Sequence, residues 1–235
     1  MEAPAVRNSL EDWSGPLARE TLGGRPTLWT RTSARSPLSP RERFRFRNGC
    51  SWRSFEPARS KLAAALVGKA PPRPPQPNDM VLYLGAATGT TASHIADLVG
   101  PRGIVYAVEK SPRAFAQLLG TATLWPNIVP LLKDVRESGS YLGWVPPVDI
   151  IYMDIPQPDQ VRIATEHVTR FLRTGGRLMM VLKLASLGRE RSAQEHLHQC
   201  LAELQRTLRV GEPSPLDPYY RRHAFIVAEL REPQP

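Results

Sequence analysis

The sequence predicts an α/β protein built on one open, doubly wound sheet, and three observations support this prediction. Short apolar runs typical of strands alternate with helical runs from residue 81 onward, and no sequence repeat interrupts the alternation. One strand run leads into a glycine turn and a helix start. Three strand runs end in or just before a carboxylate, at Glu109, Asp134 and Asp154. Because ligands bind outside the carboxyl ends of the strands in such sheets, we expect these acids to face one crevice.

The composition of the chain narrows its class. A length of 235 residues is enough to bury a full α/β core. No apolar run reaches membrane-spanning length and the first residues lack the apolar core of a signal peptide, so we expect an intracellular protein. Cys50 and Cys200 stand apart from each other and from the histidines, which favours free thiols over a disulfide, and no metal site is predicted. The net charge of +9 favours a polyanionic partner, with nucleic acid ahead of membrane.

The distribution of proline, glycine and charge divides the chain into three segments. Residues 1–40 carry scattered Pro, Gly, Ser and Arg without a sustained period, and we interpret them as a poorly ordered basic segment suited to RNA contact. Residues 41–77 predict a small subdomain, with a hairpin turning at Asn48-Gly49, a helix over Pro57–Val67 and the proline-rich linker Pro71–Pro77. The alternating arginines of this hairpin either follow RNA phosphates or mark a plain exposed edge strand. Residues 78–235 form the core domain.

The stretch Val81–Thr91 organises this core domain. The apolar run Val81–Leu84 predicts a strand buried on both faces, and it leads into Gly85, Gly89 and a helix start. Glycine lets the backbone pass close to a ligand, and the free N–H groups of a helix start attract polar or anionic ligand atoms. The Gly-x-x-x-Gly spacing matches neither the dinucleotide fingerprint nor the P-loop, so a cofactor without a pyrophosphate is expected. A buried strand that ends in a glycine turn is also common in α/β proteins without such a site.

The strand Ile104–Glu109 supplies the first acid of the predicted crevice. Glu109 ends the second core strand, where α/β nucleotide sites bind ribose hydroxyls. The alternative is an exposed or helix-capping acid. The other predicted elements are the helices Thr91–Val99, Pro112–Leu124, Val161–Phe171 (closed by Gly175-Gly176) and Ser192–Leu208, and the strands Ile128–Leu132, Val148–Met153, Leu178–Lys183 and Tyr219–Glu229.

Lysine is rare in this basic chain, so each lysine is informative. Five lysines, at positions 61, 69, 110, 133 and 183, stand against twenty-six arginines. A buried ammonium can lose its proton whereas a guanidinium stays protonated, so chemistry that needs a base can use lysine and not arginine. Lys61 lies in the first turns of the predicted helix Pro57–Val67, and Lys183 ends a predicted strand.

Four motifs together carry a resemblance to a known family. They are Pro57–Ala65 (PARSKLAAA), Val81–Thr91 with Ser93-His94, Gly103–Glu109 (GIVYAVE) and Gln157–Gln160 (QPDQ). On these residues the chain resembles fibrillarin and the archaeal fibrillarin-like RNA 2′-O-methyltransferases, from about Arg43 to Leu230. The resemblance implies a class I S-adenosylmethionine-dependent methyltransferase fold, which is Rossmann-like. Its sheet has seven strands, the last of them antiparallel, and a small N-terminal extension precedes it.

The resemblance also implies S-adenosyl-L-methionine as the cofactor. Two departures bear on its pocket: Lys110 stands where the family commonly has an aromatic residue, and Ile155-Pro156 replaces the usual small pair. The cofactor-binding residues implied by the matching motifs are Gly85, Ala86, Thr90 and Thr91 for the methionine part, Glu109 for the ribose, Lys110, Asp134 and Val135 for the adenine, and Asp154 and Gln157 for the sulfonium end.

A catalytic set is implied in the same way, at Lys61, Asp154, Lys183 and His223. A ribose 2′-hydroxyl is a weak acid that must lose its proton as it attacks the methyl group, so the site must align the two and supply a base or a stabilising cation. Lys183 is the candidate for that role, and His223 and Lys61 would hold the ribose or the adjacent phosphate. Burial and Lys61 would favour the neutral amine of Lys183 whereas Asp154 would favour the ammonium, and the sequence leaves this balance open. For each residue alone, the alternative is an ordinary salt bridge at the rim of a sheet.

The function implied is 2′-O-methylation of ribosomal or transfer RNA inside a guide-RNA particle of the box C/D type. The expected partners are the RNA, a Nop5-type scaffold and an L7Ae-type protein, with no membrane. The expected location is cytoplasmic in a prokaryote and nucleolar in a eukaryote, and the lack of a glycine-arginine-rich tail argues against the typical eukaryotic form. Two alternatives stay open: a non-catalytic RNA-binding or assembly module with the same fold, and a protein methyltransferase acting on glutamine.

Overall fold

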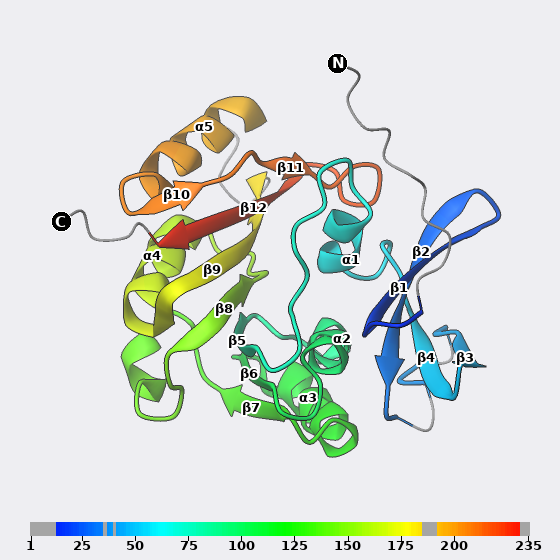
Figure 1. The fold of residues 1–235 in the computed structure, drawn as a ribbon. Helices are drawn as coiled ribbons and strands as arrows, with labels where there is room; N and C mark the ends of the chain where they lie inside the picture. Colours follow the sequence, from blue (N-terminus) through cyan, green and yellow to red (C-terminus); the bar gives the residue numbers. More distant parts are fainter. Residues whose placement is uncertain (1–12, 35–36, 40, 185–191, 231–235) are drawn as a thin grey trace.

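The computed structural model describes residues 13–34, 37–39, 41–184 and 192–230. These residues form a large central sheet with helices on both faces, and a smaller N-terminal sheet beside it (Figure 1). Residues 1–12 of the predicted N-terminal segment lie outside the described residues.

The central sheet confirms the predicted α/β architecture. Its strands run in the order β10-β12-β9-β8-β5-β6-β7, and the pairs from β9 to β7 are parallel. β12 is antiparallel to β9, as the resemblance implies for the last strand, and the short β11 adds an eighth strand on β12. The strands are β5 Met80–Leu84, β6 Ile104–Glu109, β7 Ile128–Leu132, β8 Val148–Met153, β9 Leu172–Lys183, β10 Leu208–Val210, β11 Ser214–Pro215 and β12 His223–Leu230.

The strand β5 is buried on both faces, as its uninterrupted apolar sequence predicts. Val81 and Tyr83 pack in one hydrophobic cluster with residues of α1, α2 and α3, whereas Leu82 and Leu84 pack in another with α4 and α5. The chain order reverses at β5, because the next strand β6 lies on one side of it and β8 on the other. Open α/β sheets bind ligands at such a switch point. The helices are α1 Lys61–Leu66, α2 Thr90–Val99, α3 Pro112–Leu124, α4 Gln160–Phe171 and α5 Ala193–Leu204, with a 3₁₀ helix at Ser138–Tyr141.

The helix α1 begins later than predicted. The sequence placed its start at Pro57, but Ser60 has extended backbone and its side chain accepts a hydrogen bond from the Ala63 N–H. A serine in this N-cap position satisfies a first-turn donor, so the helix begins at the following residue. That residue is Lys61, which therefore opens the helix.

Two other boundaries differ from the prediction. β9 begins at Leu172, which pairs with Val148, and Gly175 lies within the strand at φ 74° rather than closing the preceding helix. The register shifts between Val148 and Ile150, and glycine accommodates the irregular backbone there. The last strand begins at His223 rather than Tyr219, because Arg222 has the left-handed value of φ 57° that interrupts extended backbone.

The N-terminal sheet corrects the prediction for part of residues 1–40. Instead of lacking regular structure, this region contributes β1 Leu17–Leu22 and β2 Arg25–Thr32, which form a hairpin. β3 Phe44–Arg47 and β4 Cys50–Phe55 form the predicted second hairpin across Asn48-Gly49, and the sheet order is β1-β2-β4-β3. The burial of Trp29 accounts for the regular structure of β2, since its indole is fully buried in the packed sheet. The division of the chain at residues 40 and 77 stays a prediction.

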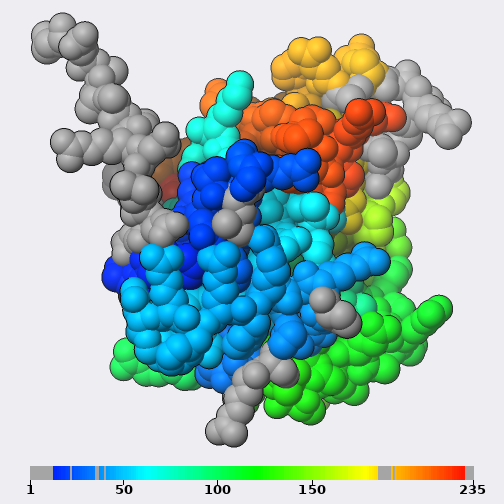
Figure 2. All heavy atoms as spheres, turned by 90° about the vertical axis from the view of Figure 1, so that its right-hand side faces the viewer, coloured from blue at the N-terminus to red at the C-terminus, as the bar shows by residue number. Residues whose placement is uncertain are grey.

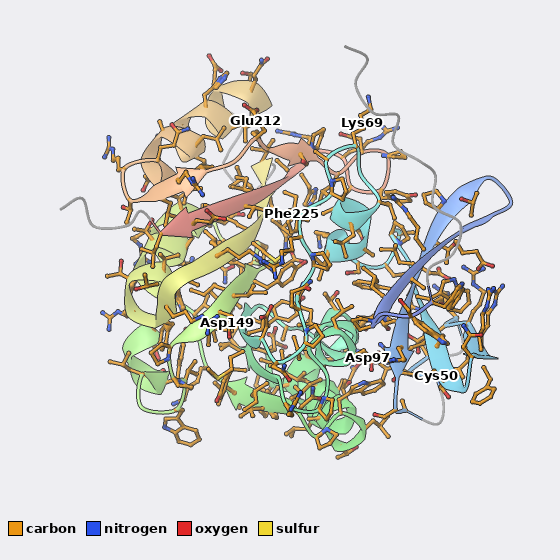
Figure 3. The ribbon with its side chains drawn as sticks, in the orientation of Figure 1. Cys50, Lys69, Asp97, Asp149, Glu212 and Phe225 are labelled. Carbon is orange, nitrogen blue, oxygen red and sulfur yellow. The ribbon has the colours of Figure 1, made fainter. Side chains whose placement is uncertain are left out.

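A buried polar network joins the N-terminal sheet to α2. Arg53 of β4 is fully buried; its Nη2 donates to Ser93 Oγ (2.6 Å) and its Nε lies 3.2 Å from Asp97 Oδ2. Thr30 of β2 and Trp125 also donate to the Asp97 carboxylate, at 3.0 and 2.8 Å. Figure 3 shows Asp97 at this junction between the two sheets. Burial raises the pKa of Asp97 to about 6, although the Arg53 guanidinium opposes the shift.

His94 belongs to the same network. Its ring stacks on Phe55 of β4 with 4.2 Å between centroids, and its Nε2 lies 3.4 Å from Glu42 Oε1. Burial lowers the pKa of His94 to about 3, so the ring is neutral at physiological pH. In the part of the chain that the structure describes, no helix is long and apolar enough to cross a membrane.

Candidate active site

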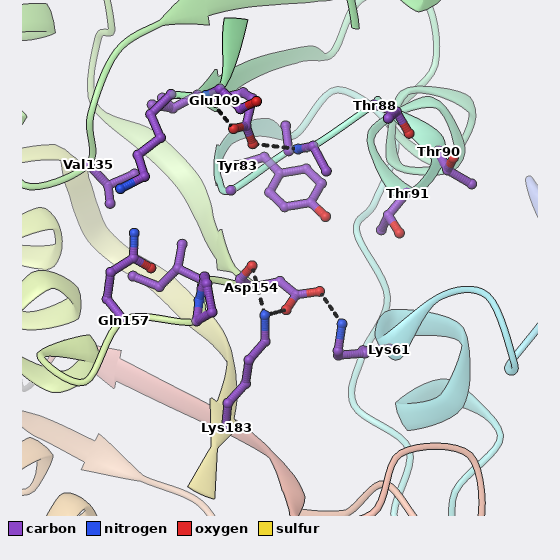
Figure 4. A pocket seen from close by; sticks show the side chains of 18 of the residues that line it. Lys61, Tyr83, Thr88, Thr90, Thr91, Glu109, Val135, Asp154, Gln157 and Lys183 are labelled. Atoms are coloured by element: carbon purple, nitrogen blue, oxygen red, sulfur yellow. Dashed lines mark hydrogen bonds and ion pairs between the residues drawn. The ribbon is translucent and has the colours of Figure 1, made fainter. Parts of the chain in front are cut away.

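A cavity of about 690 Å³ opens at the carboxyl ends of β5, β6, β8 and β9, at the switch point of the central sheet (Figure 4). Nine of the ten predicted cofactor residues line it, and Asp134 does not. Asp134 instead lies 3.7 Å from Lys110 Nζ and accepts a hydrogen bond from the Arg136 N–H. The predicted residues in the cavity wall are Gly85, Ala86, Thr90, Thr91, Glu109, Lys110, Val135, Asp154 and Gln157.

The glycine turn forms one wall of this cavity. Gly85 has φ 84°, and a Cβ at this position would lie 2.8 Å from both the Asp154 carbonyl oxygen and Ile155 Cγ2. Side chains rarely adopt such a backbone, so both the conformation and the contact require glycine. Gly89, at φ 91°, is the N-cap of α2, and Thr90 and Thr91 follow it into the cavity wall. The turn thus brings backbone and the start of α2 against any ligand in the cavity.

Glu109 faces the glycine turn from the end of β6. Its Oε2 accepts a hydrogen bond from the Ala87 N–H (2.9 Å), and its Oε1 accepts one from the Ser111 N–H (2.7 Å). Two backbone donors therefore fix the carboxylate at the cavity wall. Ser111 is the N-cap of α3, so the acid also contributes to the start of that helix. Its assignment to ribose hydroxyls stays a prediction.

Lys61, Asp154 and Lys183 converge at the other side of the cavity. Lys61 Nζ donates to Asp154 Oδ2 at 2.9 Å, and Lys183 Nζ lies 2.7 Å from Asp154 Oδ1. All three side chains are largely buried, with exposed fractions of 19%, 14% and 16%. The two lysine side chains come from distant parts of the chain, one from the start of α1 and one from the end of β9. One carboxylate between them fixes the position of both.

His223 is not brought into the cavity wall with the other three. It begins β12 directly opposite Lys183 in the sheet register, and its Nδ1 lies 2.8 Å from the Arg221 carbonyl oxygen. Tyr220 lies near both His223 and Lys61, since its ring is 5.9 Å from the His223 ring and 5.0 Å from Lys61 Nζ. Burial and the nearby Asp154 carboxylate raise the pKa of Tyr220 to about 12. The catalytic role of His223 stays a prediction.

The charge of the cavity is positive. Four of the five lysines of the chain line it, at positions 61, 110, 133 and 183, and Arg59 joins them. The acids in the wall are Glu109 and Asp154. The few lysines of this arginine-rich chain thus lie mainly around one site. Their rarity in the sequence indicated that they were informative but did not show where they meet.

Of the residues near the cavity, Ser60 was not assigned to the site from the sequence, whereas Thr91 and Gln157 were. Thr91 Oγ1 donates to Ser60 Oγ at 3.0 Å, which ties the cofactor side of the cavity to the N-cap of α1 and hence to Lys61. Gln157 is buried, and its Oε1 has no hydrogen-bond partner among the described residues. A buried carbonyl without a partner at a cavity wall is suited to accept a hydrogen bond from a ligand. Serine before a helical run was a readable N-cap signal for Ser60.

The sheet order, the glycine turn and the position of the cavity place this chain in the class of Rossmann-like methyltransferase folds. A family model described as fibrillarin matches residues 22–232. The chain is 41% identical over 183 residues to the RNA 2′-O-methyltransferase FBLL1 of Mus musculus, covering 77% of this chain and 58% of that protein. It is 39% identical over 183 residues to the fibrillarin-like rRNA/tRNA 2′-O-methyltransferase of Pyrobaculum islandicum, covering 77% of this chain and 78% of the relative. The chain belongs to the fibrillarin family, and it spans less than two thirds of the length of its mouse relative.

Solved structures of fibrillarins align with this chain over most of its length. The fibrillarin pre-rRNA processing protein of Methanococcus jannaschii aligns with a TM-score of 0.87 at 29% identity, over 92% of this chain and 94% of that one. Aeropyrum pernix fibrillarin with natively bound S-adenosyl-L-methionine aligns with a TM-score of 0.83 at 35% identity, over 91% and 94%. A fibrillarin in complex with Nop5p aligns with a TM-score of 0.81 at 34% identity, over 91% and 97%.

Proposed function

We propose that this protein transfers the methyl group of S-adenosyl-L-methionine to a ribose 2′-hydroxyl of RNA. The observation that carries the proposal is the pair of lysines held on Asp154 at the rim of the switch-point cavity. A base or cation beside a cofactor pocket is what a weakly acidic hydroxyl nucleophile requires. Family membership and the positive wall of the cavity agree with an RNA substrate.

The cavity residues fit the proposed cofactor. The Gly85 backbone leaves room that any Cβ would fill, the Glu109 carboxylate is fixed at the wall, and the Gln157 carbonyl is buried without a protein partner among the described residues. We assign the methionine part to the glycine turn with Thr90 and Thr91, the ribose to Glu109 and the adenine to the wall beside Val135. When bound, the cofactor supplies an electrophilic methyl group on a sulfonium.

Lys183 and Asp154 perform the proton transfer in this proposal. The amine form of Lys183 accepts the proton of the 2′-hydroxyl at Nζ as the oxygen bonds to the methyl group, whose bond to sulfur breaks and leaves a neutral thioether. The Asp154 carboxylate, 2.7 Å away, then stabilises the ammonium that forms and keeps its direction. Lys61 holds the second carboxylate oxygen, so Asp154 cannot rotate away from Lys183 without losing a charged hydrogen bond. Lys61 and Arg59 also offer positive charge to the adjacent phosphate.

The assembly of the protein is part of the proposal. The neighbouring fibrillarin structure in complex with Nop5p supports a Nop5-type scaffold as a partner of this chain. The intracellular location, the box C/D-type guide RNA and the L7Ae-type protein stay predictions, as do the target RNA and nucleotide.

A transfer assay with matched variants tests the function. The protein is incubated with methyl-labelled cofactor and total RNA from the source organism, with and without its scaffold and guide RNA. We expect nuclease-sensitive label with the wild type and with Lys69→Ala, since Lys69 is exposed and does not line the cavity. Lys183→Ala should lose at least about a hundredfold in rate, the lower range for general base catalysis, while it still binds cofactor.

Each alternative has its own outcome in this assay. Label that protease removes and nuclease does not would replace the RNA substrate with a protein. Absence of any label, together with no cofactor binding at millimolar concentration, would leave the RNA-binding or assembly module. Activity retained in Lys183→Ala would contradict the role of Lys183.

A further inference from the structure

The positive charge of the chain is concentrated in the N-terminal sheet. Residues 13–56 carry nine arginines against three glutamates, which is a net charge of +6 in a chain whose total is +9. The catalytic cavity lies in the central sheet and draws its charge from lysines. The arginines of the N-terminal sheet therefore form a second basic region, which the proposed chemistry does not use.

The strand register separates the two faces of this sheet. Thr30, Arg53 and Phe55 lie on the inner face, where they contact Asp97, Ser93 and His94 of α2. Directly opposed residues in an antiparallel sheet share a face and alternate along each strand. The pairs Ala18–Trp29 and Trp52–Arg45 therefore belong to the opposite, outer face. Figure 2 shows the N-terminal strands, in blue to cyan, covering the side of the molecule turned to the viewer.

The outer face is a layer of tryptophans under arginines. Trp13, Trp29 and Trp52 pack together as a small hydrophobic cluster, with Trp13 centred 4.8 Å from Trp52 and 5.9 Å from Trp29. The guanidinium carbons of Arg45 and Arg43 lie 4.5 and 5.5 Å from the centre of the Trp29 ring. That of Arg47 lies 4.7 Å from the centre of the Trp13 ring.

Stacking on an indole orders a guanidinium in a way that suits phosphate. Arginine commonly stacks its planar group on an aromatic ring, and in that arrangement its N–H donors lie in the plane and point outward from the stack. The planar fork matches the oxygens of a phosphate, and holding it in advance reduces the entropy lost on binding. Arg43 and Arg45 keep 45% and 38% of their side-chain surface exposed, so this fork remains accessible.

Two glutamates partly balance these arginines without neutralising the face. Glu20 accepts two hydrogen bonds from Arg45, at 2.8 and 2.9 Å, and both come from Nη1 of a group that has five N–H donors. Glu56 lies 3.4 Å from Arg43, an exposed pair of small strength. The third glutamate of the segment, Glu42, is buried on the inner side with Arg53 and His94.

We propose that the outer face of the N-terminal sheet, at Arg43, Arg45 and Arg47, is a second RNA-binding surface that holds the phosphate backbone outside the catalytic cavity. The choice of RNA as the polyanion rests on the proposed function. The surface binds phosphates, and contacts to phosphates position a nucleic acid without reading its sequence. It raises the affinity for long RNA and leaves the chemical step unchanged.

Equilibrium binding with charge-matched variants tests the surface without methyl transfer. A labelled RNA duplex and the single strand of the same sequence are titrated with full-length protein at several salt concentrations. Arg43→Gln/Arg45→Gln/Arg47→Gln should lower the slope of log affinity against log salt by about three and weaken binding roughly a hundredfold at 0.1 M salt. Arg102→Gln/Arg206→Gln/Arg209→Gln removes equal charge from other exposed positions and should change the slope by much less. The two RNA forms show whether the surface prefers a duplex or a single strand.

A second measurement on the wild type does not depend on the stability of the variants. Phenylglyoxal modifies exposed guanidinium groups, and mass spectrometry locates each modified arginine. Bound RNA should slow the modification of Arg43, Arg45 and Arg47 at least about fivefold relative to Arg206. Equal salt slopes for the two triple variants, or equal modification rates with and without RNA, would overturn the proposal. A protein that binds RNA through these arginines but transfers no methyl group would overturn only the proposed function.

Discussion

At the scale of single residues, the account depends on the ion pairs of Lys61 and Lys183 with Asp154 and on the backbone of Gly85. Lys183 and Lys61 share the two oxygens of Asp154, so each fixes the carboxylate for the other. Gly85 fixes the width of the cavity, because its backbone is left-handed and a Cβ there would meet the Asp154 carbonyl and Ile155. Substitution of Gly85 provides a test of the site that is independent of Lys183.

Gly85→Ala should abolish cofactor binding and destabilise the protein by about 1 to 3 kcal/mol, the usual cost of holding a side chain in strained backbone. Cofactor affinity by calorimetry and stability by urea unfolding are the measurements. Gly120→Ala is the matched control, since Gly120 lies within α3 with no atom near its added Cβ. It should keep cofactor binding and gain up to about 1 kcal/mol, because alanine favours a helix over glycine. Equal effects of the two substitutions would contradict the role of the turn.

Asp97 leads to a prediction of how the stability of the protein depends on pH. Its pKa is raised by burial from 3.8 to about 6 in the folded protein, so the folded state binds its proton more tightly than the unfolded chain. Asp97 therefore stabilises the fold below about pH 4, and this contribution is lost as the pH rises to about 6. The unfolding free energy of the wild type relative to Asp97→Asn should fall across this window, by at most about 1.4 kcal/mol per pH unit. Urea unfolding at several pH values measures it, and a difference that rises with pH would show that the sign is wrong.

At the scale of elements, the start of α1 connects the two sides of the active site. Ser60 caps the helix that begins with Lys61, and it accepts a hydrogen bond from Thr91 in the cofactor wall. The position of Lys61 thus follows from the cap as well as from Asp154. Any shift in the first turn of α1 moves the ammonium away from the carboxylate.

Ser60→Ala should therefore lower both stability and turnover. Loss of an N-cap costs about 1 kcal/mol, and the freed helix start should reduce kcat roughly tenfold with a smaller change in RNA KM. Ser192→Ala is the matched control, because Ser192 caps α5 through a capping box but does not line the cavity. It should cost a similar amount of stability and leave kcat unchanged. If the two variants lost turnover in proportion to their stability, the connection through Ser60 would not exist.

The sequence predicted some of the elements whose signals are local. The strand Val81–Leu84 and its glycine turn were predicted because a short, continuous apolar run followed by a turn signal is the sequence pattern of a strand buried on both faces. The start of β9 was missed because it depends on a distant partner, since Leu172 pairs with Val148. The start of α1 at Lys61 was missed although the N-cap serine at position 60 is a local signal. β1 and β2 were missed although Gly23-Gly24, with φ 54° and 76°, is a local signal of the two-residue hairpin turn between them. The packing of Trp29 and Thr30 against other segments is tertiary and has no local pattern.

At the scale of the whole molecule, the sheet topology explains why distant residues form one site. The carboxyl ends of the parallel strands meet at one edge, from which the sequence predicted that Glu109, Asp134 and Asp154 face one crevice. The structure places Glu109 and Asp154 in the wall of one cavity, together with Lys183. The sequence did not place Asp134 and His223 outside the cavity wall, since that depends on the course of loops and on Arg222 turning the chain before β12. The buried network around Arg53 then joins the N-terminal sheet to α2, whose first turn lines the cavity.

We expect this network to make the N-terminal sheet unfold together with the central sheet. Arg53→Met should destabilise the protein by about 3 to 5 kcal/mol, because it leaves the buried carboxylates of Asp97 and Glu42 without their cation. Chemical unfolding followed by tryptophan fluorescence and by cofactor binding should then show both signals moving to lower denaturant together. A fluorescence change at low denaturant while cofactor binding persists would show that the two sheets unfold independently.

The central claim is that the chemistry occurs at a ribose 2′-oxygen, and product analysis tests it most directly. RNA labelled by the wild-type protein from methyl-labelled S-adenosyl-L-methionine is digested fully to nucleosides and separated by chromatography with mass detection. The account predicts that the label elutes as 2′-O-methyl nucleosides. Lys183→Ala should form them at least about a hundredfold more slowly, while Lys69→Ala gives the wild-type amount. Label on a base, or on a glutamine side chain of a protein, would contradict the account.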